Sequence, residues 1–342
     1  MTGPLPVITA WSAVSPFGAG RDAFATGVRA GRATAAPPGP DWAVPDRAAC
    51  LVPDYDPVGL VGGRVGRTTN RATVFALAAV GQLTGAATGA GERTGVVLGT
   101  TVGSLRSTMS VGVDSLRESK PHHVNTKVLP AAVMNYSAAQ CAIRYGLTGP
   151  NTTIAAGRGA AVSALVYAGR LLAGGRAGRV LAGAVEEYSP ERAWANHHNG
   201  GGVLGEGSVV FQVEPGGEGL AEIVAAHSRI AAGDSGRENA DAAQATVSAL
   251  LAQAGAAARE IWAVVPGTGA GAERETAAEM FGEPVLGRVP GLGPIGDTGA
   301  SSAGFALAAA LCTPGPSGRL VLVLSADPDG SAGGILLRMK GN

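Results

Sequence analysis

Residues 145–168, YGLTGPNTTIAAGRGAAVSALVYA, decide the fold of this chain. A Gly-Pro turn at 149–150 leads into the β-branched run 152–154, and small residues at 155–161 lead into an apolar pattern with helical spacing that begins at Val162. A strand that passes through glycines into a buried helix forms the nucleophile elbow of several α/β enzymes. The sharp turn projects one side chain, and the free N–H groups of the helix N-terminus stabilise an anion beside it. The stretch therefore predicts an α/β fold with a site at this turn.

The composition fits a large, closely packed α/β protein. Hydrophobic residues make up 46% of the chain, charged residues 15% and aromatic residues 4%. Lys plus Arg and Asp plus Glu are equal at 26 each, so no basic field exists to attract nucleic acid or an acidic membrane. The scattered cysteines, Cys50, Cys141 and Cys312, lack C-x-x-C spacing and argue against disulfides and a metal site. Neither a signal-peptide pattern nor a membrane-length apolar run is found, so we expect a cytoplasmic protein.

Other motifs follow one another along nearly the whole chain. They are VITAWSAVSPFG at 7–18, GVVLGT at 95–100, LAGAVEE at 181–187 and GEGSVVF at 205–211. Together with the elbow, their order and spacing resemble the β-ketoacyl synthases of the thiolase superfamily. The resemblance implies an α/β fold of duplicated βαβαβ layers (α-β-α-β-α) in one compact unit. Its N-terminal half would span 1–215 with the elbow at 149–168, and its C-terminal half would span 216–342.

The reactive groups of a condensing enzyme are missing from the matching positions. In the family, a cysteine at the elbow attacks the acyl thioester and two histidines assist decarboxylation. Here Arg158, a guanidinium with a fixed positive charge, stands at the cysteine position, and Pro266 stands at the first histidine. Asp297 or Thr298 matches the second histidine, depending on a one-residue shift. The phenylalanine of the G-F-G-G gate loop is absent from the matching run 330–334, so we expect no condensing activity from this chain by itself.

Three roles are open for Arg158. Its guanidinium can fill the old pocket and pair with a carboxylate such as Asp297 or Glu187. It can hold a carboxylate or the phosphate of phosphopantetheine, because its fork geometry suits both. It can also lie at the interface with a partner.

The resemblance implies a chain length factor, the noncatalytic ketosynthase-like subunit of a type II polyketide synthase. Such a subunit pairs with an active ketosynthase as a heterodimer. The ketosynthase condenses intermediates that are held on an acyl carrier protein, which also brings the phosphopantetheine. We therefore expect no cofactor on this chain, and no nucleic-acid or membrane partner.

The same resemblance indicates where an acyl tunnel and a dimer interface would lie. In the family, bulky residues on the helix before the elbow limit product length. The matching helix here has no aromatic residue, which predicts room for an extended chain, for example a polyene. The expected tunnel residues are Thr108, Met109, Val111, Gly112 and Val113. The run 135–140 resembles a segment near the family's dimer interface, so Asn135 and Tyr136 are expected there.

Two other functions remain open. The chain could be a homodimeric thiolase-fold protein that binds an acyl group or a carrier protein without a catalytic partner. It could also be an enzyme with relocated chemistry, such as acyl transfer from Ser301 or Ser302, although no histidine aligns near either serine. Copurification of an active ketosynthase would separate the chain length factor from the binding protein.

Overall fold

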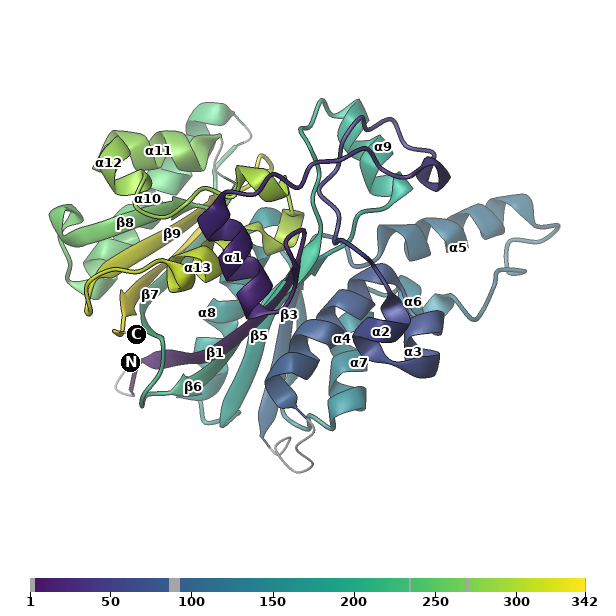
Figure 1. Ribbon diagram of the computed structural model, residues 1–342, viewed down its shortest axis with the longest axis horizontal. Helices are drawn as coiled ribbons and strands as arrows, with labels where there is room; N and C mark the ends of the chain where they lie inside the picture. Colours follow the sequence, from purple (N-terminus) through teal and green to yellow (C-terminus); the bar gives the residue numbers. More distant parts are fainter. Residues whose placement is uncertain (1–3, 86–92, 234, 269–270, 342) are drawn as a thin grey trace.

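The computed structural model describes residues 4–85, 93–233, 235–268 and 271–341, and it has a mixed α/β architecture (Figure 1). Its strands form one sheet in the order β4-β3-β5-β6-β1-β7-β10-β9-β8, with β2 paired to β1. The strands are β1 (Pro6–Ser15), β2 (Gly18–Ala19), β3 (Thr94–Thr100), β4 (Asn151–Ala155), β5 (Arg179–Glu186), β6 (Gly207–Pro215), β7 (Ala221–Ile230), β8 (Ile261–Pro266), β9 (Leu320–Ala326) and β10 (Ser331–Met339).

The helices alternate with these strands along most of the chain. They are α1 (Arg21–Ala30), α2 (Pro57–Val61), α3 (Gly63–Thr68), α4 (Arg71–Thr84), α5 (Leu105–Arg117), α6 (Leu129–Ala132), α7 (Tyr136–Tyr145), α8 (Ala160–Ala173), α9 (Pro190–His198), α10 (Gly236–Ala254), α11 (Ala272–Phe281), α12 (Glu283–Leu286) and α13 (Ser302–Cys312). Short 3-10 turns η2 (Gly157–Gly159) and η5 (Gly299–Ser301) precede α8 and α13. Among the described residues, we find no helix that combines the length and apolar character needed to cross a membrane.

The sheet contains the same topology twice. In the N-terminal half the path is β3-β5-β6-β1, and in the C-terminal half it is β8-β9-β10-β7. In each half the first pair is parallel and the next two are antiparallel. The halves meet where β1 pairs with β7 through Val7–Glu222 and Ile8–Ala221. The duplication that the family resemblance implied is therefore confirmed, although no repeat is visible in the sequence. Within the described residues, β4 has no counterpart strand in the second half.

Helices α8 and α13 lie between the half-sheets, and α4, α7, α10 and α11 cover their outer faces (Figure 1). α8 and α13 contact each other and share the central core with strands of both halves. All of α13 from Ser302 to Leu311 is buried, as expected for a helix that is apolar on every side. α4 and α7 cover the outer face of the N-terminal half, and α10 and α11 cover the outer face of the C-terminal half. This arrangement confirms the α-β-α-β-α layering.

The sequence also predicts a surface excursion at 32–63, which is rich in Pro, Ala and Gly, and a helix at 240–258. Most of the segment 32–63 is exposed or half-buried as expected, and it is held to the body near Ala49, Cys50 and Val52, which are buried and where the backbone N–H of Cys50 donates to Leu204 O at 2.8 Å. The helix expected at 240–258 starts at Gly236 and ends at Ala254. Its start is set by a capping box between Ser235 and Glu238, and its end by Gly255 in the left-handed conformation.

A fully buried carboxylate links three segments of the N-terminal half. Glu206 accepts hydrogen bonds from Arg71 Nε at 2.6 Å and Nη2 at 2.5 Å. It also accepts the backbone N–H groups of Val52 at 2.9 Å and Tyr188 at 3.1 Å. The Arg71 guanidinium lies 3.8 Å from the ring centre of Tyr55, so the cation is covered by an aromatic face. The pair holds segment 32–63 and the connection after β5 against the start of α4.

Replacing Arg71 by Met should destabilise the fold strongly, because it leaves the Glu206 carboxylate buried without a cation. We expect a loss of about 3–5 kcal/mol in the free energy of unfolding, measured by urea denaturation at pH 7. The matched control is Arg274→Met, which removes the exposed Arg274–Glu283 pair and should cost less than about 1 kcal/mol. Equal effects of the two substitutions would contradict the role given to Glu206.

Candidate functional site

The predicted elbow is present, and Arg158 lies at its turn. β4 ends at Ala155, η2 carries Arg158, and α8 starts at Ala160. Gly157 has φ +48, and a Cβ on it would overlap the carboxylate of Asp327, so both the conformation and the space require glycine there. The strand–turn–helix geometry expected from the sequence is thus confirmed.

Arg158 is held by two carboxylates from the C-terminal half. Its Nη2 donates to Asp297 Oδ2 at 2.5 Å, and its backbone N–H donates to Asp327 Oδ2 at 2.7 Å. Of the alternatives for Arg158, pairing with Asp297 is confirmed and pairing with Glu187 is wrong. Glu187 instead accepts from Ser104 Oγ at 2.8 Å and from the Ala72 N–H at 3.1 Å. This difference arises because the end of β5 turns Glu187 toward α4 and α5 and away from the elbow.

Around Arg158, one guanidinium lies among three carboxylates. Burial would lower the pKa of Arg158, but Asp297, Asp327 and Glu273 raise it on balance. For Asp297, burial would raise the pKa, but the Arg158 charge lowers it on balance. Glu273 is buried, and burial raises its pKa even though Thr268 and the Ala326 N–H donate to it. The site is therefore an internally paired charge cluster whose cation is the elbow residue itself.

The backbone on both sides holds Asp297 in place. Its N–H donates to Val203 O and its carbonyl accepts from the Gly205 N–H, each at 2.8 Å. Arg192 Nη2 also donates to the Asp297 carbonyl at 3.0 Å, and its Nη1 donates to Gly205 O at 2.7 Å. Thr298 is buried and bonds Ser302 Oγ at 3.1 Å. Of the two residues that could match the second histidine, Asp297 is therefore the one that contacts the elbow residue.

The remaining candidate chemical groups are already engaged or nonreactive. Pro266 ends β8, pairs with Leu324 of β9 and offers no titratable group. Ser301 is buried and donates to Gly207 O at 3.1 Å. In the described part of the chain, neither Ser301 nor Ser302 has a histidine partner that could act as a base, and no group of three or more His, Cys, Asp or Glu residues could hold a metal.

Sequence reasoning missed Asp327 and Glu273. Both are distant from the elbow in the sequence, and neither matches a family motif. A signal for Asp327 did exist, because the run Asp327-Pro328-Asp329-Gly330 places two carboxylates directly before the stretch that was matched to the gate loop. A positively charged residue at the elbow calls for such an anion nearby, since a half-buried charge is costly without a partner.

The expected tunnel and interface residues lie on the outer elements of the N-terminal half. Thr108, Met109, Val111, Gly112 and Val113 all belong to α5, which contacts α6 and α9. Met109 is 48% exposed, and a Cβ on Gly112 would meet no atom within 4 Å.

The two expected interface residues lie at the start of α7. Asn135 is exposed and Tyr136 is half-buried. In the single chain, all of these expected positions therefore face or border solvent and do not contact Arg158.

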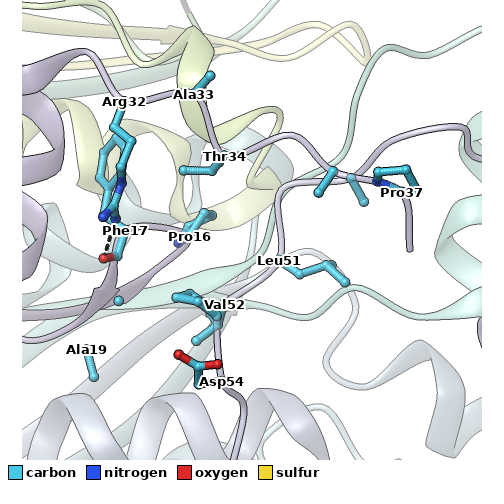
Figure 2. Close-up of a pocket in the computed structure, with 14 residues that line it drawn as sticks. Pro16, Phe17, Ala19, Arg32, Ala33, Thr34, Pro37, Leu51, Val52 and Asp54 are labelled. Carbon is cyan, nitrogen blue, oxygen red and sulfur yellow. Dashed lines mark hydrogen bonds between the residues drawn. The ribbon is translucent and has the colours of Figure 1, made fainter. Parts of the chain in front are cut away.

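A cavity of about 730 Å³ lies apart from the elbow, between the β1–β2 turn and segment 32–54 (Figure 2). Figure 2 shows Arg32 and Asp54 at opposite ends of it, with Pro16 and Val52 between them. Arg32 Nη2 donates to Phe17 O at 2.6 Å. The volume is in the range of small-molecule sites, but the charged groups do not converge on one point, so we assign no chemistry to it.

The part of the chain that contains the elbow is similar in sequence to β-ketoacyl synthases. Residues 67–219 match the family model described as "Beta-ketoacyl synthase, N-terminal domain". Over 91 residues the chain is 31% identical to 3-oxoacyl-[acyl-carrier-protein] synthase 2 of Rhizobium meliloti (strain 1021). That alignment covers 27% of the chain and spans only about a fifth (21%) of the length of that relative.

Solved structures match over nearly the whole chain. The structure described as the ishigamide ketosynthase/chain length factor is 38% identical, with a TM-score of 0.93, and the match covers 98% of this chain and 100% of that one. A ketosynthase in complex with its chain length factor from Xenorhabdus doucetiae is 16% identical, with a TM-score of 0.76 and 98% coverage of both chains, which supports the fold alone. On the strand–elbow–helix geometry, the duplicated layers and the full-length match at 38% identity, the chain belongs to the β-ketoacyl synthase family.

Proposed function

We propose that this chain is the noncatalytic, chain-length-factor-like subunit of a type II polyketide synthase and pairs in the cytoplasm with an active ketosynthase. The observation that carries the proposal is Arg158, which stands in place of a nucleophile and is bound by Asp297 and Asp327. In the proposed complex, the ketosynthase condenses intermediates on an acyl carrier protein that brings its own phosphopantetheine. This subunit completes the dimer and forms the far end of the acyl tunnel.

The contact between Asp327 and the elbow amide supports a noncatalytic role. In the Ser-His-Asp proteases, the backbone N–H of the nucleophile itself is one of the donors that stabilise the oxyanion of the tetrahedral intermediate. Here the N–H of Arg158 already donates to Asp327 Oδ2 at 2.7 Å. An oxyanion at this place would lose that donor and would face a carboxylate of the same charge. The same loop therefore blocks the oxyanion position of an elbow that already lacks its nucleophile.

An exposed apolar surface supports the pairing with another chain. Of the eleven large hydrophobic side chains that are exposed among the described residues, seven lie on 102–143, on α5, α6 and α7 and the segments before and between them, with α6 in contact with both α5 and α7. We call them the apolar face, and they are Val102, Met109, Leu116, Leu129, Val133, Met134 and Ile143. Exposed apolar clusters of this kind mark protein interfaces. β4, the end strand of the sheet, lies beside α7 and has an open edge that another strand could pair with.

Helix α5 is oriented opposite to an ordinary surface helix. Leu105, Met109 and Leu116 fall on one side of a helix with 3.6 residues per turn, and Leu116 is 87% exposed. Ser107 falls on the other side and is buried against the body. Figure 1 shows α5 projecting from the body beside α6. A helix with its apolar side outward is stable in this position when a partner covers that side, which favours a dimer as the working state.

The central test of the proposal is coexpression with the ketosynthase encoded beside this chain, followed by size-exclusion chromatography and native mass spectrometry. We expect a one-to-one heterodimer, and chain elongation only when both chains are present. As a matched control, Met109→Glu with Leu116→Glu should abolish pairing while leaving the chain folded, because both positions are exposed. A homodimer that binds no active ketosynthase would contradict the proposal and favour the acyl- or carrier-protein-binding alternative.

Replacing Arg158 by Cys should not restore condensing activity. The carboxylates of Asp297 and Asp327 next to the introduced thiol should raise its pKa above the usual value of about 8.5, so that little thiolate exists at neutral pH. We expect slow alkylation by iodoacetamide and no acyl adduct by mass spectrometry. The triple variant R158C/D297N/D327N should react faster, since both charges are removed. An acyl adduct on R158C alone would contradict the proposed block of the oxyanion position by Asp327.

Replacing Gly112 by Trp should shorten the products of the heterodimer if α5 lines the tunnel. The position has open space in this chain, so the indole can be accommodated without disturbing the fold. Product lengths are measured by mass spectrometry of the reconstituted heterodimer. Gly236→Trp, at an equally open glycine of α10 in the other half, should leave the products unchanged. Unchanged products from an assembled G112W heterodimer would rule out the tunnel assignment.

A further inference from the structure

Hydrogen bonds contribute to the position of α5, because serine side chains lie on its side toward the body together with the half-buried Val111. Ser107 lies there and is buried, while Met109 and Leu116 point the other way. Thr108 Oγ1 donates to Ala132 O at 3.1 Å, and Asp114 Oδ2 accepts the Asn125 N–H at 3.1 Å. Both of these contacts are with neighbouring, exposed segments. Neither of them connects α5 to the sheet.

One side chain of the sheet makes that connection. Glu187 directly follows β5 and is buried. Its Oε1 is 2.8 Å from the Oγ of Ser104, which is the N-cap of α5, and its Oε2 accepts the Ala72 N–H at the start of α4 at 3.1 Å. Ser104 Oγ also lies 2.9 Å from Ser107 Oγ and accepts the Ser107 N–H at 3.2 Å. A single carboxyl group thus joins the N-termini of two helices to the end of β5.

We propose that Glu187 is a positioning residue that fixes the N-terminus of α5 against the sheet and thereby sets the depth of the acyl tunnel. The part about tunnel depth rests on the proposed function, because it requires α5 to line the tunnel. The part about α5 does not, because it concerns this chain alone. Glu187 ends the motif at 181–187 but lies outside the positions of the nucleophile and the two histidines.

The hydroxyl protons available between Ser104, Ser107 and Glu187 are consistent with a neutral Glu187 carboxyl group. Ser104 has one hydroxyl proton for two neighbouring oxygens, Glu187 Oε1 and Ser107 Oγ, so one of the two bonds takes its proton from the other side. Either the Ser107 hydroxyl or a protonated Glu187 can supply it. Burial raises the pKa of Glu187 to about 7, against the hydrogen bonds from Ser104 and the backbone, which lower it.

The charged groups that face Glu187 do not neutralise its ionised form. Glu186, next to it on the chain, adds a like charge. On α4, Arg71 already donates through Nε and Nη2 to the carboxylate of Glu206. On α9, Arg192 donates to backbone carbonyls, including Glu187 O at 3.2 Å. Tyr55 faces the same cluster. The pKa of Glu187 is raised from its ordinary value of 4.5 to about 7. Its contribution to stability is therefore complete below pH 4.5 and is lost as the pH rises through about 7.

Hydrogen exchange of the isolated full-length chain, followed by mass spectrometry, tests the anchoring. In S104A and E187A, the amides of α5 should exchange at least about fivefold faster, as loss of an N-cap predicts. In the unmodified chain, α5 protection corrected for intrinsic exchange should fall between pH 6 and pH 8. E187Q should keep the protection at both values, because its amide can accept from Ala72 and donate to Ser104 without titrating. The matched control S235A removes the N-cap of α10 and should change exchange in α10 only.

The outcomes separate the anchoring from the proposed function. Unchanged α5 exchange in both S104A and E187A, or a pH dependence that persists in E187Q, would overturn the anchoring by Glu187. In the reconstituted heterodimer, S104A and E187A should broaden the range of product lengths, and E187Q should retain it. Faster α5 exchange with unchanged products from an assembled heterodimer would overturn the role in tunnel depth. Failure of the unmodified chain to pair with any ketosynthase would overturn the proposed function and leave the exchange test intact.

Discussion

The contact on which the centre of this protein depends is the pairing of Arg158 with carboxylates from the opposite half. A guanidinium that is largely withdrawn from water requires an anion within hydrogen-bond distance, because the cost of desolvating it is otherwise several kcal/mol. Asp297 supplies that anion, and its own backbone is held by the strand-like segment at 203–205 and by Arg192. Asp327 adds a second anchor at the amide of Arg158. A turn that serves chemistry in related enzymes therefore acts in this chain as a joint between the two halves.

The elbow and the apolar face differ in how their side chains are satisfied within this chain. At the elbow, the charge of Arg158 is paired with carboxylates inside the chain. On α5 the pattern is reversed, since apolar side chains such as Met109 and Leu116 face outward and serines face the body. Only Ser107 of α5 is fully buried, so polar contacts such as Ser104 with Glu187 help to hold the helix in the isolated chain. The uncovered apolar surface agrees with the proposed pairing with a ketosynthase.

Much of the fold could be predicted from the sequence, because its signals are local. The strand–glycine–helix pattern at 149–168 depends on residues that are neighbours in the chain, and the structure has it near its predicted bounds. Helix α10 starts before the predicted helix at 240–258 because the Ser235–Glu238 capping box sets its first turn. The duplication was visible only in the order of strands, since β3-β5-β6-β1 and β8-β9-β10-β7 share hydrogen-bond topology without sharing residues. The burial of Cys50 depends on Leu204, which the sequence places far away.

The sequence by itself determined the reactive inventory of the elbow: an arginine at 158, a proline at 266 and no histidine at either matching position. These are properties of side-chain chemistry and need no coordinates. The tertiary structure decided which acids meet that arginine. Asp327 reaches the amide of Arg158 across 169 residues of sequence, and Glu187, an equally plausible partner by composition, turns to Ser104 and Ala72 instead. The physical reason is that hydrogen bonds and ion pairs act over about 3 Å, and which groups come that close is set by the packing of the two halves.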